Sequence, residues 1–221
     1  MEQKLDDRQF DAEKLGLTQL LRQYDIDTTL WGAEGAKTVN HLVKEIMSHE
    51  CQLVENGGEL LRIVSIAEGV ITYINSDGVT YRLHKQEQAS EEDNRTRTRP
   101  YRSYAPVSEK MVTNEEPLSA LMRGINDELG IATVLSVYKT PEIKVVSSDS
   151  LSFPGLSSVY KFHTYSVSID RSVYKPKGYQ KVQPDKTNYY VWERIESPRI
   201  TGASDDDPKG DDALNPLYNV W

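Results

Sequence analysis

Cysteine is almost absent from this chain of 221 residues, since Cys51 is the only one. An intramolecular disulfide is therefore excluded, which fits a reducing compartment. Long apolar runs are also missing. No stretch approaches the roughly 18 residues of a membrane span, and the first residues lack the apolar region of a signal peptide. We therefore predict a cytoplasmic protein that does not associate with a membrane.

Concentrated positive charge is missing as well. The formal net charge is −8, and half of that excess lies in residues 201–221, where five Asp accompany one Lys. Binding to duplex nucleic acid needs a concentrated basic surface, whereas a small charged nucleotide is compatible with this composition. A Gly-any-Ser-any-Gly motif is also absent, so serine-dependent hydrolysis is not indicated.

The apolar pattern that is present favours an α+β fold. Helices are predicted at residues 11–24 and 38–49, followed by short strands at 51–54, 60–66, 70–74 and 79–83, with turns at 68–69 and 75–78. Further strands are predicted at 107–111, 133–138, 159–169 and 188–195, and residues 147–155 have the composition of a loop that could cover a pocket. This order argues against a doubly wound parallel sheet.

Residues 115–131 predict an amphipathic helix that carries two neighbouring carboxylates. At about 100° per residue, its apolar residues form a stripe of ordinary width. The stripe consists of Leu118, Leu121, Met122, Ile125 and Leu129. Gly130 ends the helix, and Asp127 and Glu128 point away from the centre of the stripe. Taken alone, these two carboxylates could simply be the solvated side of the helix.

The spacing around this helix resembles the Nudix box of the Nudix hydrolase superfamily. That pattern is Gly, five residues, Glu, seven residues, then Arg-Glu-apolar-any-Glu-Glu-any-Gly-apolar. Residues 109–131 keep the spacing over 23 residues and fit seven of the nine specified positions, with Asp127 counted as a replacement for Glu. The matching residues are Glu115, Arg123, Ile125, Asp127, Glu128, Gly130 and Ile131. Glu109 stands in place of the opening Gly, and Gly124 stands in place of the Glu that follows Arg.

The resemblance implies hydrolysis of a pyrophosphate linkage in a nucleoside-diphosphate-type substrate, with carboxylates that hold Mg²⁺ or Mn²⁺. Asp127 and Glu128 would be metal ligands, with a backbone carbonyl near Glu109 as a further ligand. Glu115 and Arg123 would join the helix to its preceding loop through an ion pair, and both would belong to the catalytic set together with Glu128. The implied fold is a mixed sheet between helices.

Gly124 decides between two hypotheses. A glycine can neither bind a metal nor act as a base, and inside a helix it costs about 1 kcal/mol relative to Ala. If the chain is an enzyme, another carboxylate must approach Asp127 and Glu128, and Asp149, Asp185 and Glu193 are candidates by location only. The alternative is a catalytically inactive Nudix-like module that binds a nucleotide or a protein partner. A homodimer is equally compatible with the sequence.

Two further constellations have plainer interpretations. Arg95, Arg97 and Arg99 alternate with Thr, so an extended chain would align them on one side, where they could grip a phosphate chain. We favour a soluble edge strand protected by charge. His41, Glu45 and His49 are four residues apart and could bind zinc, but they lie on the polar side of their helix, so we favour a solvated surface.

These patterns predict three segments. Residues 1–100 would form an extension of two helices and short strands packed on the core, residues 101–198 a Nudix-like core, and residues 199–221 an acidic flexible tail. The aromatic-rich end of residues 185–193 resembles a late Nudix strand, but we favour an ordinary sheet strand, with Tyr189 and Val191 on one face and Tyr190 and Trp192 on the other.

Overall fold

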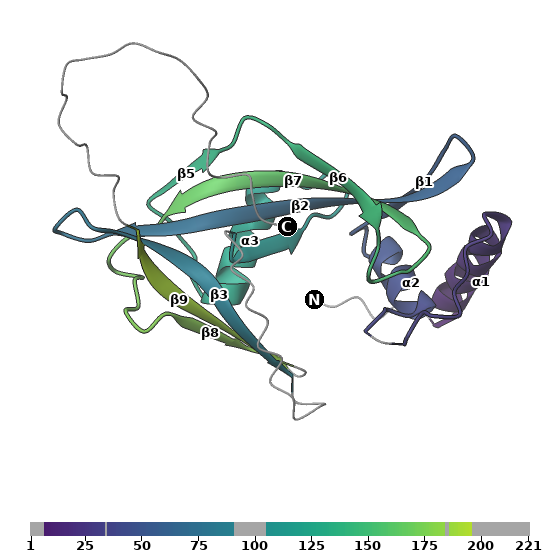
Figure 1. Ribbon diagram of the computed structural model, residues 1–221, viewed down its shortest axis with the longest axis horizontal. Helices are drawn as coiled ribbons and strands as arrows, with labels where there is room; N and C mark the ends of the chain where they lie inside the picture. The colour runs from purple at the N-terminus through teal and green to yellow at the C-terminus, as the bar shows by residue number, and fades with distance from the viewer. Residues whose placement is uncertain (1–6, 34, 91–104, 184–185, 196–221) are drawn as a thin grey trace, which may run out of the picture.

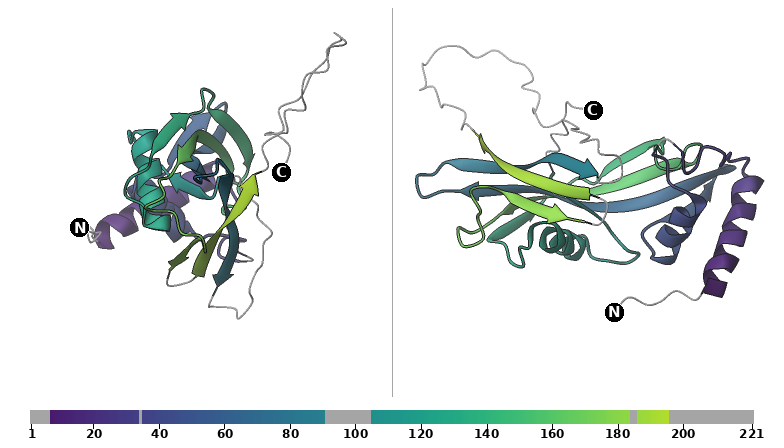
Figure 2. Two further views of the ribbon diagram at one scale, coloured as in Figure 1. Left: turned by 90° about the vertical axis from the view of Figure 1, so that its left-hand side faces the viewer. Right: turned by 90° about the horizontal axis from the view of Figure 1, so that it is seen from below.

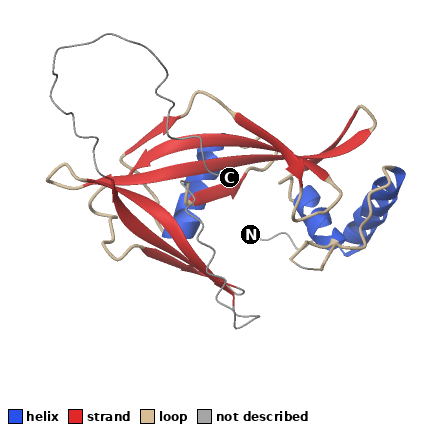
Figure 3. Cartoon of the chain, in the orientation of Figure 1, coloured by secondary structure: helices blue, strands red, loops and turns tan. Residues whose placement is uncertain are grey.

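The computed structural model describes residues 7–33, 35–90, 105–183 and 186–195 (Figures 1 and 3). Helices α1 (Asp7–Gln23) and α2 (Val39–Met47) precede strands β1 (Gln52–Asn56), β2 (Glu59–Ile74), β3 (Thr80–Ser90) and β4 (Val107–Lys110). Helix α3 (Pro117–Leu129) follows, and then come β5 (Ser136–Lys139), β6 (Lys144–Asp149), β7 (Ser157–Ser168), β8 (Tyr179–Val182) and β9 (Lys186–Ile195). The predicted α+β class is confirmed.

Strand β2 organises one mixed sheet, in which the main strand order is β5-β7-β2-β3-β9-β8. One edge of β2 pairs with β7 in parallel over eleven residue pairs, from Arg62 with Ser158 to Thr72 with Ser168. The other edge pairs in turn with β1, β4 and β3, all antiparallel. The sheet therefore joins strands from both sides of residue 100, the predicted segment boundary, which itself lies outside the described residues.

The buried face of β2 changes along its length. Leu60 and Val64 belong to a core with α1 and α2, whereas Ala67, Ile71 and Tyr73 belong to a core with α3. Side chains alternate between the two faces of a strand, so these even and odd positions point to opposite faces. The two helical layers thus pack on different stretches of β2, and the prediction of a mixed sheet packed with helices is confirmed. Figure 2 shows that the α1–α2 pair lies near one end of the molecule and α3 further along.

Gly69 explains one wrong prediction. The sequence predicts a turn at residues 68–69 between two short strands, but β2 runs through this point without interruption. A β-carbon on Gly69 would lie only 2.9 Å from Cδ1 of Leu121, so the glycine allows α3 to approach the sheet closely. The predicted turn at 75–78 does form, and the backbone N–H of Asn75 donates to the carbonyl of Val79 at 3.0 Å.

The segment at 147–155 is not the predicted loop throughout. Its first three residues belong to β6, and Phe153 is fully buried in the core with α1 and α2. Trp31 packs against Phe153 with 5.1 Å between ring centroids and donates its indole N–H to the carbonyl of Pro154 at 2.9 Å. The small polar residues of this segment led to the prediction of a loop, and the burial of Phe153 was not predicted.

None of the helices in the described part of the chain is long and apolar enough to cross a membrane. The described residues after α3 form strands and loops. Arg95, Arg97 and Arg99, Asp185 and the predicted acidic tail all lie outside the described residues.

Candidate functional site

Helix α3 presents the candidate site on a firmly packed scaffold. Pro117 occupies the first turn, and Gly130 ends the helix with a left-handed φ of 69° while its N–H donates to Asn126 O at 2.8 Å. Leu121, Ile125 and Leu129 of the predicted stripe are buried. Leu118 is 44% exposed, so the stripe begins one turn later than predicted.

Arg123 ties α3 to the segment that precedes it. Its Nη2 donates to Glu115 Oε2 at 3.0 Å and to the backbone carbonyl of Lys110 at 3.0 Å, and its Nε lies 3.3 Å from Glu115 Oε1. Glu115 Oε2 also accepts the N–H of Val112 at 3.0 Å. Burial opposes ionisation of Glu115, but the hydrogen bonds from Arg123 and Val112 outweigh it and lower its pKa. The structure thus brings together the pair that the resemblance implied.

Glu109 fills the space beside Gly124. A β-carbon built on Gly124 would lie 2.9 Å from the β-carbon of Glu109 and 3.1 Å from Cγ1 of Val107. Position 124 is buried and cannot accept a side chain unless these neighbours move. The two departures from the Nudix pattern are therefore in contact, through the β- and γ-carbons of Glu109.

Glu109 also interacts electrostatically with the other acidic groups of the site. Its side chain forms an ion pair with Nη1 of Arg123. Burial raises the pKa of Glu109, the Arg123 guanidinium opposes that shift, and the negative charges of Asp127 and Glu128 add to it. The three predicted metal residues are thus close enough to interact electrostatically.

Glu128 points toward β9. Its Oε2 accepts hydrogen bonds from the phenol of Tyr190 and, at 3.1 Å, from Nδ2 of Asn188. Both donors are 1% exposed. Burial and the neighbouring Glu128 carboxylate raise the pKa of Tyr190, so the phenol stays protonated and keeps its role as a donor. The sequence pattern predicts an aromatic sheet strand here but identifies neither partner of Glu128, because only the fold places them beside α3.

Asp127 is exposed at the end of α3, and its backbone carbonyl accepts a hydrogen bond from Lys181 Nζ of β8 at 2.6 Å. Among the residues that the structure describes, no three His, Cys, Asp or Glu side chains lie close enough together to hold a metal ion. Glu109, Asp127 and Glu128 share one region, but Arg123 and Tyr190 draw two of the carboxylates in different directions.

The other acidic candidates lie elsewhere. Asp149 is exposed on β6. Glu193 is 2.9 Å from Nε2 of His84, which is a neighbour across the β3–β9 pairing. Neither residue has a described contact with Asp127 or Glu128. Within the described part of the chain, Glu109 is a carboxylate outside α3 that interacts with both.

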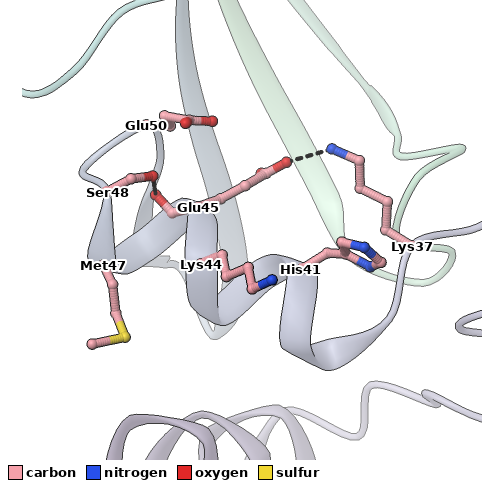
Figure 4. Close-up of a pocket in the computed structure, with 7 residues that line it drawn as sticks. All are labelled: Lys37, His41, Lys44, Glu45, Met47, Ser48 and Glu50. Carbon is pink, nitrogen blue, oxygen red and sulfur yellow. Dashed lines mark hydrogen bonds and ion pairs between the residues drawn. The ribbon is translucent and has the colours of Figure 1, made fainter. Parts of the chain in front are cut away.

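Glu45 is not the solvated residue that the sequence analysis expected. It is 5% exposed and accepts Lys37 Nζ at 2.6 Å, Lys110 Nζ at 2.6 Å and Arg62 Nη2 at 2.5 Å. Its contact with Lys37 lies at the wall of a surface cavity of about 520 Å³ (Figure 4). Nδ1 of His41 accepts the backbone N–H of Thr38 at 3.0 Å and so caps α2. Glu45 thus anchors α2 to β2 and β4.

Comparison with known proteins gives structural neighbours only. No protein-family model matches the chain, and no curated protein matches its sequence. The Ap4A hydrolase of C. elegans is 14% identical, with a TM-score of 0.33, over 60% of this chain and 80% of that one. RenU, a Nudix hydrolase from M. smegmatis, is 13% identical, with a TM-score of 0.31, over 59% and 70%. A MutT/nudix family protein from Enterococcus faecalis is 12% identical, with a TM-score of 0.39, over 82% and 57%.

Proposed function

We propose that the chain is a Nudix-like hydrolase that cleaves a pyrophosphate linkage in a nucleoside-diphosphate-type substrate and uses Mg²⁺ or Mn²⁺. The contact between Glu109 and Gly124 carries the proposal, because the position without a carboxylate is filled by the side chain of another acidic residue. Glu109, Asp127 and Glu128 then supply three carboxylates near the same end of α3. Carboxylate oxygens are the ligands that these hard cations prefer.

Each residue has a role in this proposal. A divalent cation would neutralise phosphate charge and lower the pKa of an attacking water. Asp127 and Glu128 would bind it from α3, and Glu109 would approach from β4. Glu109 must then leave Arg123, which keeps its bonds to Glu115 and to the carbonyl of Lys110. Glu109 has the raised pKa, and a carboxylate with a higher pKa is the better proton acceptor.

The alternative is an inactive module that binds a nucleotide or a protein partner. It is favoured by the hydrogen bonds that engage Glu128 and by the lack of a ready-made metal cluster in the described part of the chain. In that case the Arg123 network would only stabilise the segment before α3.

The decisive test is hydrolysis. Dinucleotides, nucleotide sugars and nucleoside triphosphates are screened with Mg²⁺ and with Mn²⁺, and phosphate or nucleoside monophosphate release is measured. We expect Glu109→Gln, Asp127→Asn and Glu128→Gln each to lower kcat by about 100-fold, because each removes a charged ligand or a base.

Glu116→Gln is the matched control. Glu116 is an exposed carboxylate at the opposite end of α3, and its replacement should leave turnover within about twofold, in the range of ordinary surface substitutions. If the three site variants turn over substrate as fast as this control does, the enzyme proposal fails and the binding module is favoured.

A further inference from the structure

A row of three side chains crosses the sheet on the face that α3 covers. Ala67 of β2 pairs with Glu109 of β4 on one side and with His163 of β7 on the other. Directly paired residues project from the same face, and two strand spacings amount to about 10 Å. His163 therefore projects from the same face of the sheet as Glu109, and Ala67 between them is buried under α3.

Two lysines share this face with His163. Lys161 lies two residues before it on β7 and pairs with Ser65, and Lys139 of β5 pairs with Tyr165, which belongs to the core under α3. Both lysines are exposed. Burial lowers the pKa of His163, and the positive charges of Lys139 and Lys161 lower it further, so each lysine lies within electrostatic reach of the imidazole.

The cluster of Lys139, Lys161 and His163 has unused binding capacity. Nδ1 of His163 is buried without a hydrogen-bond partner within the described part of the chain. Neither lysine forms a salt bridge to a described carboxylate, although the whole chain carries a net charge of −8. An anion beside His163 would be attracted by both lysines, and its charge would favour the protonated imidazole that burial and the lysines disfavour.

We propose that Lys139, Lys161 and His163 form a binding site for the phosphate chain of a ligand. This inference rests on the proposed function, for which it supplies the substrate-binding subsite. The basic cluster would hold the far end of the phosphate chain, about two strand spacings from Glu109. Ammonium groups bind phosphate oxygens as point charges, so the cluster would select for charge rather than for a particular nucleoside.

The test is binding of inorganic pyrophosphate to the full chain, measured by titration calorimetry at constant ionic strength and without a metal. We expect Lys139→Ala combined with Lys161→Ala to weaken binding about tenfold or more, because two charge-assisted contacts are lost. Lys144→Ala is the matched control, since Lys144 is exposed on β6 but pairs with Phe162 and so belongs to the opposite face. It should leave the Kd unchanged.

The inference is overturned if the wild-type chain does not bind pyrophosphate, if the double variant binds as tightly as the wild type, or if Lys144→Ala causes an equal loss. Thermal unfolding checks that the double variant is folded. Kinetics then separate the two proposals, because the double variant should raise KM with little change in kcat. If the wild type hydrolyses no substrate but the double variant loses pyrophosphate binding, the subsite is supported and the hydrolase is refuted. If the wild type hydrolyses a substrate and the double variant has an unchanged KM, the hydrolase is supported and the subsite is refuted.

Discussion

Gly124→Glu alone is expected to lower the free energy of unfolding by about 2–3 kcal/mol, whereas the exchange of Glu109→Gly with Gly124→Glu should recover most of that loss. The single variant forces a side chain into a space that is only 2.9 Å from the β-carbon of Glu109 and 3.1 Å from Val107. The exchange removes that obstacle and returns a carboxylate to the helix. Chemical denaturation of the wild type, both single variants and the double variant measures the coupling.

Ala substitutions provide the control for this cycle. Glycine inside a helix costs about 1 kcal/mol relative to Ala, so Gly16→Ala in α1, where the new β-carbon meets nothing within 4 Å, should stabilise the chain. Gly124→Ala should destabilise it instead. An equal gain at both positions would refute the close packing of Glu109 against α3. In the hydrolysis assay, Glu109→Gly should be inactive, and the exchanged variant should recover activity.

Glu45→Gln is expected to cost about 3–5 kcal/mol, the usual result of removing one partner from a buried ion pair. Glu45 is 5% exposed, and the change would leave Arg62, which is 2% exposed, without its carboxylate. Glu50→Gln is the control, because Glu50 is half-buried and its described ion pair is a single one, to Lys110 at 3.1 Å. It should cost about 1 kcal/mol or less. Similar losses in both variants would contradict the role of Glu45.

The free energy of unfolding should also depend on pH through the carboxylate of Glu45. Burial opposes its ionisation, but hydrogen bonds from Lys110, Lys37 and Arg62 lower its pKa from 4.5 to about 2. A depressed folded-state pKa stabilises the fold above the unfolded-state value, and this contribution of about 3 kcal/mol is lost as the pH falls from about 4.5 to about 2. Unfolding free energies measured between pH 6 and 3 should therefore fall more steeply for the wild type than for Glu45→Gln. Parallel curves would contradict the prediction.

Local patterns predicted the elements of the fold well. The periodicity of residues 115–131 anticipated α3, and Gly130 ends the helix where expected. Gly69 misled the prediction because its reason is tertiary, since it accommodates Leu121 of α3. The burial of Glu45 was missed for a similar reason. Two of its partners, Arg62 and Lys110, lie 17 and 65 residues away, and helical periodicity carries no information about such distant charges.

The candidate site was predictable only in part. The resemblance to the Nudix box implied the pair of Arg123 with Glu115 and singled out Asp127 and Glu128. It could not reveal that Glu109 touches Gly124, because these residues are adjacent only after β4 joins β2 and α3 packs on the sheet. The partners of Glu128 on β9 follow from the same docking, since Tyr190 is 62 residues from Glu128 in sequence.

The long strand β2 has a consequence for how the molecule unfolds. Its first half is buried under α1 and α2 and its second half under α3, so neither hydrophobic cluster can open without loosening the same hydrogen-bonded strand. The two layers should therefore melt as one cooperative unit, with the amides between Val64 and Ile71 among the slowest to exchange with solvent. A one-residue insertion between Val64 and Ala67 would rotate the side chains of one half of the strand to the opposite face of the sheet, away from their helical layer.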